Sequence, residues 1–197
     1  WKIKQGVSED AKRWEDLRPC ASDYVKKCRL RVRKHIPKEG KKILDMASGP
    51  IQYPEYIEYS HGYDKRVCVD LSKDALDLAK EKIGSHGEYF WGSFLEIPLK
   101  ENSFDCSISL HTIYHIDKSR QEDAVRKLIF VTKENRPIII VYSNPNTIIS
   151  KITKGVNFLK KNMFTNNITR TKKQKDLYFY AHKLEWWNRF EDIAHVK

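Results

Sequence analysis

The chain alternates short apolar runs with longer amphipathic stretches between residues 42 and 142. Five of the apolar runs have the length of buried strands and are bounded by turn-forming residues. The amphipathic stretches space their apolar residues as one face of a helix does. The pattern predicts strands at 42–46, 66–70, 88–91, 104–110 and 137–142, and helices at 73–83 and from 119 to about 130.

Capping residues set the expected limits of these helices. Ser72 can cap the first turn of helix 73–83, and Gly84 suits its carboxyl-terminal end. Ser119 and Glu122 have the spacing of a capping box at the start of the second helix. Because strands alternate with helices, the expected fold is a doubly wound, Rossmann-like α/β domain, with a mostly parallel sheet and helices on both faces.

The two ends of the chain have weaker patterns. The elements predicted there are a helical stretch at 8–36 broken near Pro19, an amphipathic helix or helix entry at 177–190, and a sixth strand at 192–197. The expected organisation is a single domain over residues 1–197, with an N-terminal helical cap at 1–36 and an insertion or lid at 145–190.

Small and acidic residues collect where the first two expected strands end. Asp45 precedes a turn of small residues that contains Ala47 and Gly49, and the second strand ends at Asp70. Doubly wound folds bind ligands at the carboxyl ends of their strands. Small residues allow a ligand to approach the backbone, and a carboxylate can accept hydrogen bonds from two ribose hydroxyls. The layout favours a nucleotide-type ligand, although Asp45 could instead cap the turn.

The turn argues against a dinucleotide. A dinucleotide fingerprint needs three glycines in the pattern GxGxxG, and the register from Ala47 to Gln52 contains only Gly49. A nicotinamide-dependent dehydrogenase is therefore disfavoured. A nucleoside ligand without a pyrophosphate makes fewer demands on this turn.

Four segments in order resemble the motifs of the class I S-adenosylmethionine-dependent methyltransferases, of the methyltransferase type 11 kind. The first family motif, (D/E)xGxGxG, is matched at Asp45 and Gly49, whereas Ala47 and Ile51 stand where it has glycine. The other three are Asp70-Leu71-Ser72, the stretch from Gly92 to Leu99, and the stretch from Ser103 to Ile116. The final antiparallel strand of that family's fold has no counterpart here, so the chain either continues beyond Lys197 or builds this edge differently.

The resemblance implies S-adenosyl-L-methionine as cofactor and assigns residues to its site. Asp70 would bind the ribose, Leu71 would pack on the adenine, and Ser93 stands where the family usually has the aspartate that holds the adenine amino group. Phe94 and Leu95 would face the adenine or belong to the ordinary core. The other expected cofactor-binding residues are Asp45, Ala47, Ser48, Gly49, Pro50, Leu110 and His111.

Two histidines at the end of the fourth strand are candidates for catalysis. His111 and His115 would lie beside the methyl donor, where a neutral imidazole could take a proton from an acceptor hydroxyl. His111 is the stronger candidate, because the residue that matches His115 in the family often has a structural role. Tyr53, in the loop after the first motif, could border either the donor or the acceptor.

The net charge of +11 has two interpretations. Basic residues concentrate at 26–42 and 151–175, which fits either affinity for a polyanion or a solvated surface. The (N/D)PP(Y/F) motif of amino-group nucleic acid methylases is missing after the fourth strand, where the sequence is Ser109-Leu110-His111-Thr112. A small-molecule or glycan acceptor, methylated on oxygen, is therefore favoured over nucleic acid. A phosphorylated or nucleotide-linked acceptor would also account for the basic surface.

The cysteines and the apolar runs bear on the setting of the protein. The four cysteines have no metal-ligand spacing, so no metal site is expected. Their pattern suits a reducing, cytoplasmic location. No apolar run approaches about 20 residues, and the charged N-terminus has no signal-like stretch, so no membrane span is expected.

Two hypotheses of different classes follow from the sequence. The first is an enzyme that transfers a methyl group from S-adenosylmethionine. The second is a methyltransferase-like module that binds a nucleic acid or a partner with little turnover, to which the departures at Ala47, Ile51 and Ser93 lend support. The sequence does not define the acceptor or the oligomeric state.

Overall fold

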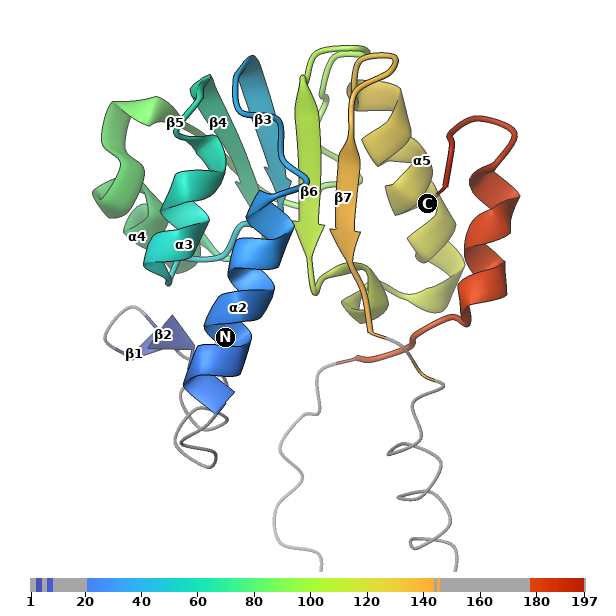
Figure 1. Cartoon of the computed structure of the whole chain (residues 1–197), viewed down its shortest axis with the longest axis horizontal. Coiled ribbons are helices and arrows are strands. Elements are labelled where there is room, and N and C mark those ends of the chain that lie inside the picture. Colours follow the sequence, from blue (N-terminus) through green and yellow to red (C-terminus); the bar gives the residue numbers. More distant parts are fainter. Residues whose placement is uncertain (1–2, 5–6, 9–20, 144, 146–177, 197) are drawn as a thin grey trace, which may run out of the picture.

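A five-stranded sheet forms the centre of the domain (Figure 1). The computed structural model describes residues 3–4, 7–8, 21–143, 145 and 178–196. The strands, given in their order across the sheet, are β5 (Gly87–Trp91), β4 (Tyr63–Asp70), β3 (Gly40–Met46), β6 (Cys106–Leu110) and β7 (Ile138–Val141). All four pairings are parallel. The five predicted strands and the parallel sheet are confirmed.

The strand order places a topological switch beside β3. From β3 the chain passes to β4 and β5 on one side, then returns to β6 and β7 on the other. The connections that leave β3 and β6 therefore diverge, and a crevice opens above their carboxyl ends. Such switch points are where doubly wound sheets bind ligands.

Helices cover both faces of the sheet. One face carries α2 (Ala21–Arg33), α3 (Pro54–Ile57) with the 3₁₀ turn η1 (Glu58–Ser60), and α4 (Lys73–Ile83), which pack through clusters that include Ile43, Ile108 and Cys68. The opposite face carries α5 (Gln121–Val131) and the 3₁₀ helix η5 (Leu184–Phe190), packed on Leu44, Met46 and Val69. Successive strand residues thus contribute to opposite cores, as strand geometry requires.

Local signals account for α4 as the sequence predicted. The Ser72 hydroxyl accepts a hydrogen bond from the Ala75 amide at 3.2 Å and so caps the helix. Ala75, Leu76 and Ala79 are buried against the sheet. Gly84 follows with a φ of 52°, and the short turn η2 (Gly84–His86) leads into β5.

The predicted capping box of the second helix is wrong. Instead of capping the helix, Ser119 donates hydrogen bonds from its amide and its hydroxyl to the Asp117 carboxylate, at 2.9 and 2.5 Å. This arrangement stabilises the turn η4 (Lys118–Arg120), which follows the turn η3 (Ile113–His115). As a result α5 begins at Gln121, and Glu122 pairs with Arg126 and Arg189 instead of capping the helix.

The predictions for the chain ends are partly wrong. Before α2 the described residues include the two-residue strands β1 (Ile3–Lys4) and β2 (Val7–Ser8), which pair with each other, so Ser8, the first residue of the predicted helical stretch, is extended, whereas residues 9–20 lie outside the described part. Residues 178–183 have no regular structure, and only η5 is helical in the predicted 177–190 helix. Residues 192–194 form a turn and a bend, and residues 195–196 have no regular structure, where a strand was predicted at 192–197. Most of the predicted insertion, residues 146–177, lies outside the described part.

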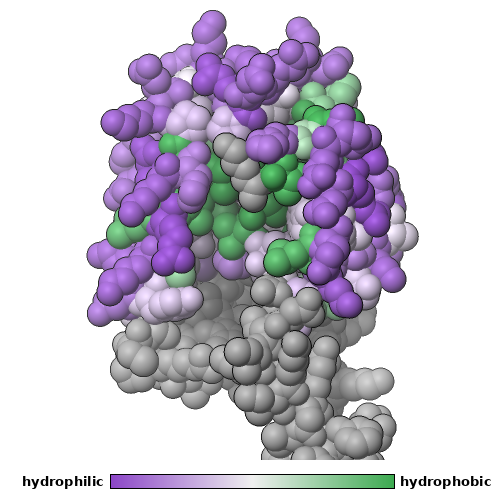
Figure 2. Space-filling view, turned by 45° about the vertical axis from the view of Figure 1, so that its right-hand side comes forward, coloured by the Kyte–Doolittle hydropathy of each residue, from purple (hydrophilic) through white to green (hydrophobic). Residues whose placement is uncertain are grey.

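The edge of the sheet at β7 is apolar. All four β7 residues are half-buried, and among the described strands none pairs with its outer side. Figure 2 shows hydrophobic residues gathered in the middle of the face that includes this edge, with hydrophilic side chains on both flanks. In the described part of the chain, no helix is both long and apolar enough to cross a membrane.

Candidate functional site

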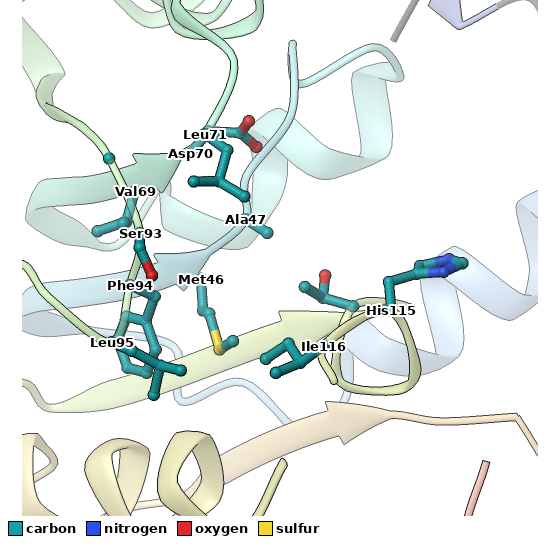
Figure 3. A pocket seen from close by; sticks show the side chains of 12 residues that line it. Met46, Ala47, Val69, Asp70, Leu71, Ser93, Phe94, Leu95, His115 and Ile116 are labelled. Atoms are coloured by element: carbon teal, nitrogen blue, oxygen red, sulfur yellow. The ribbon is translucent and has the colours of Figure 1, made fainter. Parts of the chain in front are cut away.

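A cavity of about 200 Å³ opens at the carboxyl ends of β3, β4 and β6 (Figure 3). Its walls come from the ends of β3 and β4, from the residue that follows each of them, and from the turns that follow β5 and β6. The lining residues are Met46, Ala47, Val69, Asp70, Leu71, Gly92, Ser93, Phe94, Leu95, Thr112, His115 and Ile116. Seven of these belong to the site predicted from the sequence, namely Ala47, Asp70, Leu71, Ser93, Phe94, Leu95 and His115.

Two backbone amides fix the carboxylate of Asp70. The Gly49 amide donates to Oδ2 at 2.9 Å, and the Ser72 amide donates to Oδ1 at 2.8 Å. Each carboxylate oxygen has a second lone pair available. The side chain is therefore held in place between the first turn and the start of α4, and it can still accept hydrogen bonds from a ligand.

The turn after β3 keeps a glycine-like backbone without the glycines. Ala47, Gly49 and Ile51 have φ angles of 56°, 59° and 47°, in the left-handed region. A non-glycine residue pays roughly 1–2 kcal/mol for that conformation. Ile51 offsets this cost by packing, because its side chain is 1% exposed within the cluster of Cys68, Leu76 and Ala79. The two departures from the family motif thus leave the turn conformation itself in place.

Asp45 lies on the other side of the sheet from the cavity-lining Met46. Its side chain points toward the face of α3 and α4, where Arg66 donates to Oδ2 from both Nε, at 3.1 Å, and Nη2. Arg66 also donates from Nη1 to the Tyr56 carbonyl. Both charged side chains are buried, and burial raises the pKa of Asp45 although Arg66 opposes the shift. Asp45 therefore does not line the cavity, and its ion pair with Arg66 joins β3 to β4 on the opposite face of the sheet.

The remaining residues of the predicted turn lie behind the cavity wall. The Ser48 amide donates to the Val69 carbonyl at 3.2 Å, which ties the turn to β4. The Pro50 carbonyl accepts a hydrogen bond from Lys82 Nζ at 2.9 Å. Leu110 packs with the cluster on the α2 face of the sheet. These residues shape the turn and the sheet without lining the cavity.

Apolar side chains form one wall of the cavity. Phe94 is 6% exposed, and Lys127 Nζ lies 5.2 Å from the centre of its ring while donating to the carbonyls of Leu95 and Ile97. Leu71, by contrast, is 74% exposed at the rim. Figure 3 shows Ser93, Phe94 and Leu95 on the side opposite His115. The site therefore combines a fixed carboxylate with an apolar slot.

The two histidines have different surroundings. The His111 side chain reaches solvent, but neighbouring protein atoms partly desolvate it and His115 lies close by, so its pKa is lowered from 6.5. Its ring centre is 6.4 Å from that of Tyr114. His111 is not among the cavity-lining residues, yet its low pKa keeps it neutral at physiological pH.

His115 is oriented by a distant segment. Its Nδ1 lies 2.8 Å from the carbonyl oxygen of Tyr178, and since a carbonyl only accepts, Nδ1 carries the proton. Nε2 is then the unprotonated nitrogen of the neutral ring. Figure 3 shows the ring directed away from Met46 and Ala47. The Tyr180 amide also donates to the Tyr114 carbonyl at 2.8 Å, so residues 178–180 are attached along this turn.

Sequence reasoning missed five lining residues: Met46, Val69, Gly92, Thr112 and Ile116. Met46 and Val69 are register partners next to the predicted acids, so strand alternation could have indicated them. The other three depend on turns whose course the pattern does not define. Among the described residues, no group of three His, Cys, Asp or Glu side chains could hold a metal ion.

Comparison with known proteins points to one family. A family profile described as a methyltransferase domain matches residues 44–140. A search of curated protein sequences found no match. Several solved structures share the fold. The YcgJ protein of Bacillus subtilis is 16% identical with a TM-score of 0.57, and the match covers 83% of this chain and 64% of that one.

Two further structures agree. The BH2331 protein of Bacillus halodurans is 18% identical with a TM-score of 0.61, covering 84% of this chain and 67% of that one. Phosphoethanolamine N-methyltransferase 2 of Haemonchus contortus, in complex with S-adenosyl-L-methionine, is 18% identical with a TM-score of 0.56, covering 84% and 36%. The chain thus spans from about a third to two thirds of the length of these proteins.

The order of the four motifs, the all-parallel sheet and the profile match agree with one another. Residues 44–140 of this chain therefore belong to the methyltransferase domain family, with the fold of the class I S-adenosylmethionine-dependent methyltransferases.

Proposed function

We propose that this domain transfers the methyl group of S-adenosylmethionine to an oxygen atom of a small molecule or a sugar unit. The observation that carries the proposal is the Asp70 carboxylate, which two backbone amides hold at the end of β4 beside an apolar cavity. The donor complex of the Haemonchus contortus enzyme, which shares the fold, supports the choice of donor.

The residues present fit such a donor. Asp70 would accept hydrogen bonds from the two ribose hydroxyls with its free lone pairs. Leu71, Phe94 and Leu95 would border the adenine, with Ser93 as a polar neighbour, and the small side chain of Ala47 leaves the turn accessible. The cavity is smaller than the roughly 300–1,000 Å³ of typical ligand pockets. A nucleoside-sized ligand would therefore extend over the rim at Leu71.

The chain's own groups would position the acceptor and accept its proton. When bound, the donor would supply a sulfonium methyl group that an acceptor oxygen can take in a direct displacement, in which the S–CH₃ bond breaks and S-adenosylhomocysteine leaves as a neutral thioether. Holding the acceptor in line provides much of the acceleration in such reactions. His111, kept neutral by its lowered pKa, is our proposed general base for a hydroxyl acceptor. His115, with its Nδ1 proton engaged by the Tyr178 carbonyl, is the second candidate.

The preference for an oxygen acceptor rests on the neutral imidazole of His111. A hydroxyl must lose a proton as it is methylated, so a base beside the site is useful, whereas some amines react without one. The location that suits the protein is the reducing cytoplasm, since Cys28, Cys68 and Cys106 are free thiols in the described part of the chain.

Calorimetric titration with S-adenosylmethionine and S-adenosylhomocysteine tests the donor. Asp70→Asn is expected to weaken both by about tenfold or more, since it removes a charged acceptor. Asp77→Asn, which changes an exposed acid on α4, is the matched control and should bind as the wild type does. Binding of neither compound by the wild type would refute the enzyme.

Methyl transfer to panels of hydroxyl-bearing and amine-bearing acceptors tests the second half of the proposal. Transfer to hydroxyl compounds that His111→Asn slows without weakening donor binding is the expected result. Transfer to amines alone would refute an oxygen acceptor. Donor binding without turnover on any acceptor would favour the methyltransferase-like binding module.

A further inference from the structure

We propose that the outer face of α2 docks this domain on the surface of an anionic lipid membrane. The proposal does not depend on methyl transfer, because it rests on a surface separate from the cavity. Eight basic residues and two acids lie between Ser22 and Lys41. Six of the basic side chains are exposed, namely Lys26, Lys27, Arg31, Lys34, Lys38 and Lys41.

These six cations have no partner within the described part of the chain, where no ion pair or side-chain hydrogen bond engages them. Some basic residues elsewhere in the described part are paired, as Lys42 is with Glu88 at 2.9 Å and Lys133 with Asp105 at 2.7 Å, whereas none of these six is. The contrast matters, because unpaired cations on one surface produce a net positive potential that paired ones cancel.

The helix geometry gathers the charges on one side. Lys27, Arg31 and Lys34 are spaced at i, i+4 and i+7, so they follow one side of α2 and of the turn after it, over about 10 Å. Lys26 and Leu30 extend the same face. Together these residues form the basic face of α2. Its breadth suits an extended anionic surface better than a single phosphate group, which needs donors that converge on one point.

The inner face of α2 fixes this orientation. Arg29, 8% exposed, pairs with Glu55 of α3 at 3.2 Å, and its guanidinium lies 3.5 Å from the centre of the Tyr53 ring. The α2 helix therefore cannot rotate freely about its axis, and the basic face stays directed outward. In Figure 1 the N-terminal half of α2 extends below the arrowheads of β6 and β7, on the side where the cavity opens.

The side chains among the cations favour lipid over nucleic acid. Tyr24 is 67% exposed and Leu30 38% exposed, and such residues insert at the level of lipid headgroups. Arg and Lys can contact guanine as well as phosphate, but nucleic-acid surfaces add amide side chains that read adenine or several aromatics that stack on bases, and this face has no Asn or Gln and a single aromatic residue. A cluster of four to eight basic residues on a helix is also typical of anionic lipid binding.

Co-sedimentation with lipid vesicles tests the proposal on the full chain. Vesicles of phosphatidylcholine alone are compared with vesicles that also contain phosphatidylserine, at about 0.1 M and about 1 M salt, where the screening length falls from about 10 to about 3 Å. The expected result is binding to the phosphatidylserine vesicles at low salt and loss of binding at high salt. Absence of binding at low salt, or equal binding to both vesicles, would overturn the proposal.

Charge-reversal variants locate the surface. Lys27→Glu/Arg31→Glu/Lys34→Glu is expected to lower the partition onto phosphatidylserine vesicles on the order of 100-fold. Lys80→Glu/Lys100→Glu/Lys183→Glu changes the net charge equally at exposed residues outside α2 and should stay within about threefold of the wild type. An equal loss in both would mean that overall charge drives binding, which would refute a specific face.

Two further measurements remove the remaining ambiguities. The neutral variant Lys27→Gln/Arg31→Gln/Lys34→Gln, checked by urea unfolding, separates lost binding from lost folding, and it should be folded and bind weakly. A folded neutral variant that binds as the wild type does would contradict the proposal. Tighter binding to a labelled single-stranded oligonucleotide than to the vesicles would also overturn it, in favour of nucleic acid.

Discussion

The buried pair of Asp45 and Arg66 is expected to control the stability of the site. Both side chains are almost fully enclosed, at 2% and 1% exposure, between β3, β4 and α3. Arg66→Met would leave the carboxylate without its hydrogen-bond donors and the Tyr56 carbonyl without Nη1. Removing one partner of a buried pair costs about 3–5 kcal/mol.

That loss is large compared with the stability of a domain. Total unfolding free energies are about 5–15 kcal/mol. For a chain of this size each 1 kcal/mol lowers Tm by about 2–4 °C, so Arg66→Met should lower Tm by roughly 6–20 °C. The double variant Asp45→Leu/Arg66→Met replaces both charges by apolar groups, and such replacements are often neutral. It should recover most of the lost stability.

The change in the stability of Arg66→Met with pH provides an independent test of the same pair. Burial already raises the pKa of Asp45, and removing Arg66 should raise it further. When the pKa of a carboxyl group is higher in the folded state than in the unfolded state, the protein loses stability as pH rises from the unfolded pKa to the folded pKa. Arg66→Met should therefore be less destabilised near pH 4 than at pH 7, while the double variant should lack this dependence.

Urea unfolding followed by circular dichroism measures these effects. The matched control is the exposed pair of Lys73 and Asp77, 65% and 60% exposed with 3.5 Å between Nζ and Oδ2, where Lys73→Gln should cost no more than about 0.5 kcal/mol. A loss below about 1 kcal/mol for Arg66→Met would refute the reasoning, because it contradicts the expected cost of an unpaired buried charge. A double variant as unstable as the worse single one would refute the coupling.

Three further predictions concern the turn, the sheet and the base. Ala47→Gly should raise the unfolding free energy by up to about 1 kcal/mol in urea titrations, because it relieves a φ of 56°, whereas Ala79→Gly inside α4 should lower it by about 2 kcal/mol, because it loses helix propensity and a buried methyl group. Burial alone would raise the pKa of Asp105, but Lys133 Nζ and the amides of Lys42 and Lys41 hold it below 3.8. The unfolding free energy should therefore fall as pH drops below about 4. In Asp105→Asn this fall, measured by urea unfolding at a series of pH values, should be smaller. The rate of methyl transfer should rise with pH through a pKa below 6.5, because His111 must be neutral to accept a proton. His111→Asn should abolish this dependence of the rate on pH, whereas the control His61→Gln should keep it. An unchanged pH profile in His111→Asn would refute the role of His111 as the base.

The sheet was predictable because each strand carries its own pattern. The predicted and observed limits of each strand differ by at most three residues. The expected strand 104–110 begins at Cys106, since Phe104 makes only a single bridge to Thr132. The helix 73–83 was right at both ends because Ser72 and Gly84 act locally.

Features that depend on distant contacts were not predictable. The pairing of Asp45 with Arg66 could not be foreseen, because it depends on which residues of β3 and β4 face α3. The contact between His115 and the Tyr178 carbonyl joins residues 63 positions apart. Local propensity likewise did not reveal that Asp117 would replace the expected capping box by bonding Ser119. In each case tertiary structure decided between local alternatives.

The most direct test of the central claim is a crystal structure of the domain with S-adenosylhomocysteine. We expect both ribose hydroxyls within hydrogen-bond distance of the Asp70 carboxylate, which keeps its bonds to the Gly49 and Ser72 amides. We also expect the adenine between Leu71 and Phe94. A ligand bound elsewhere, or a ribose out of reach of Asp70, would contradict the proposed donor site.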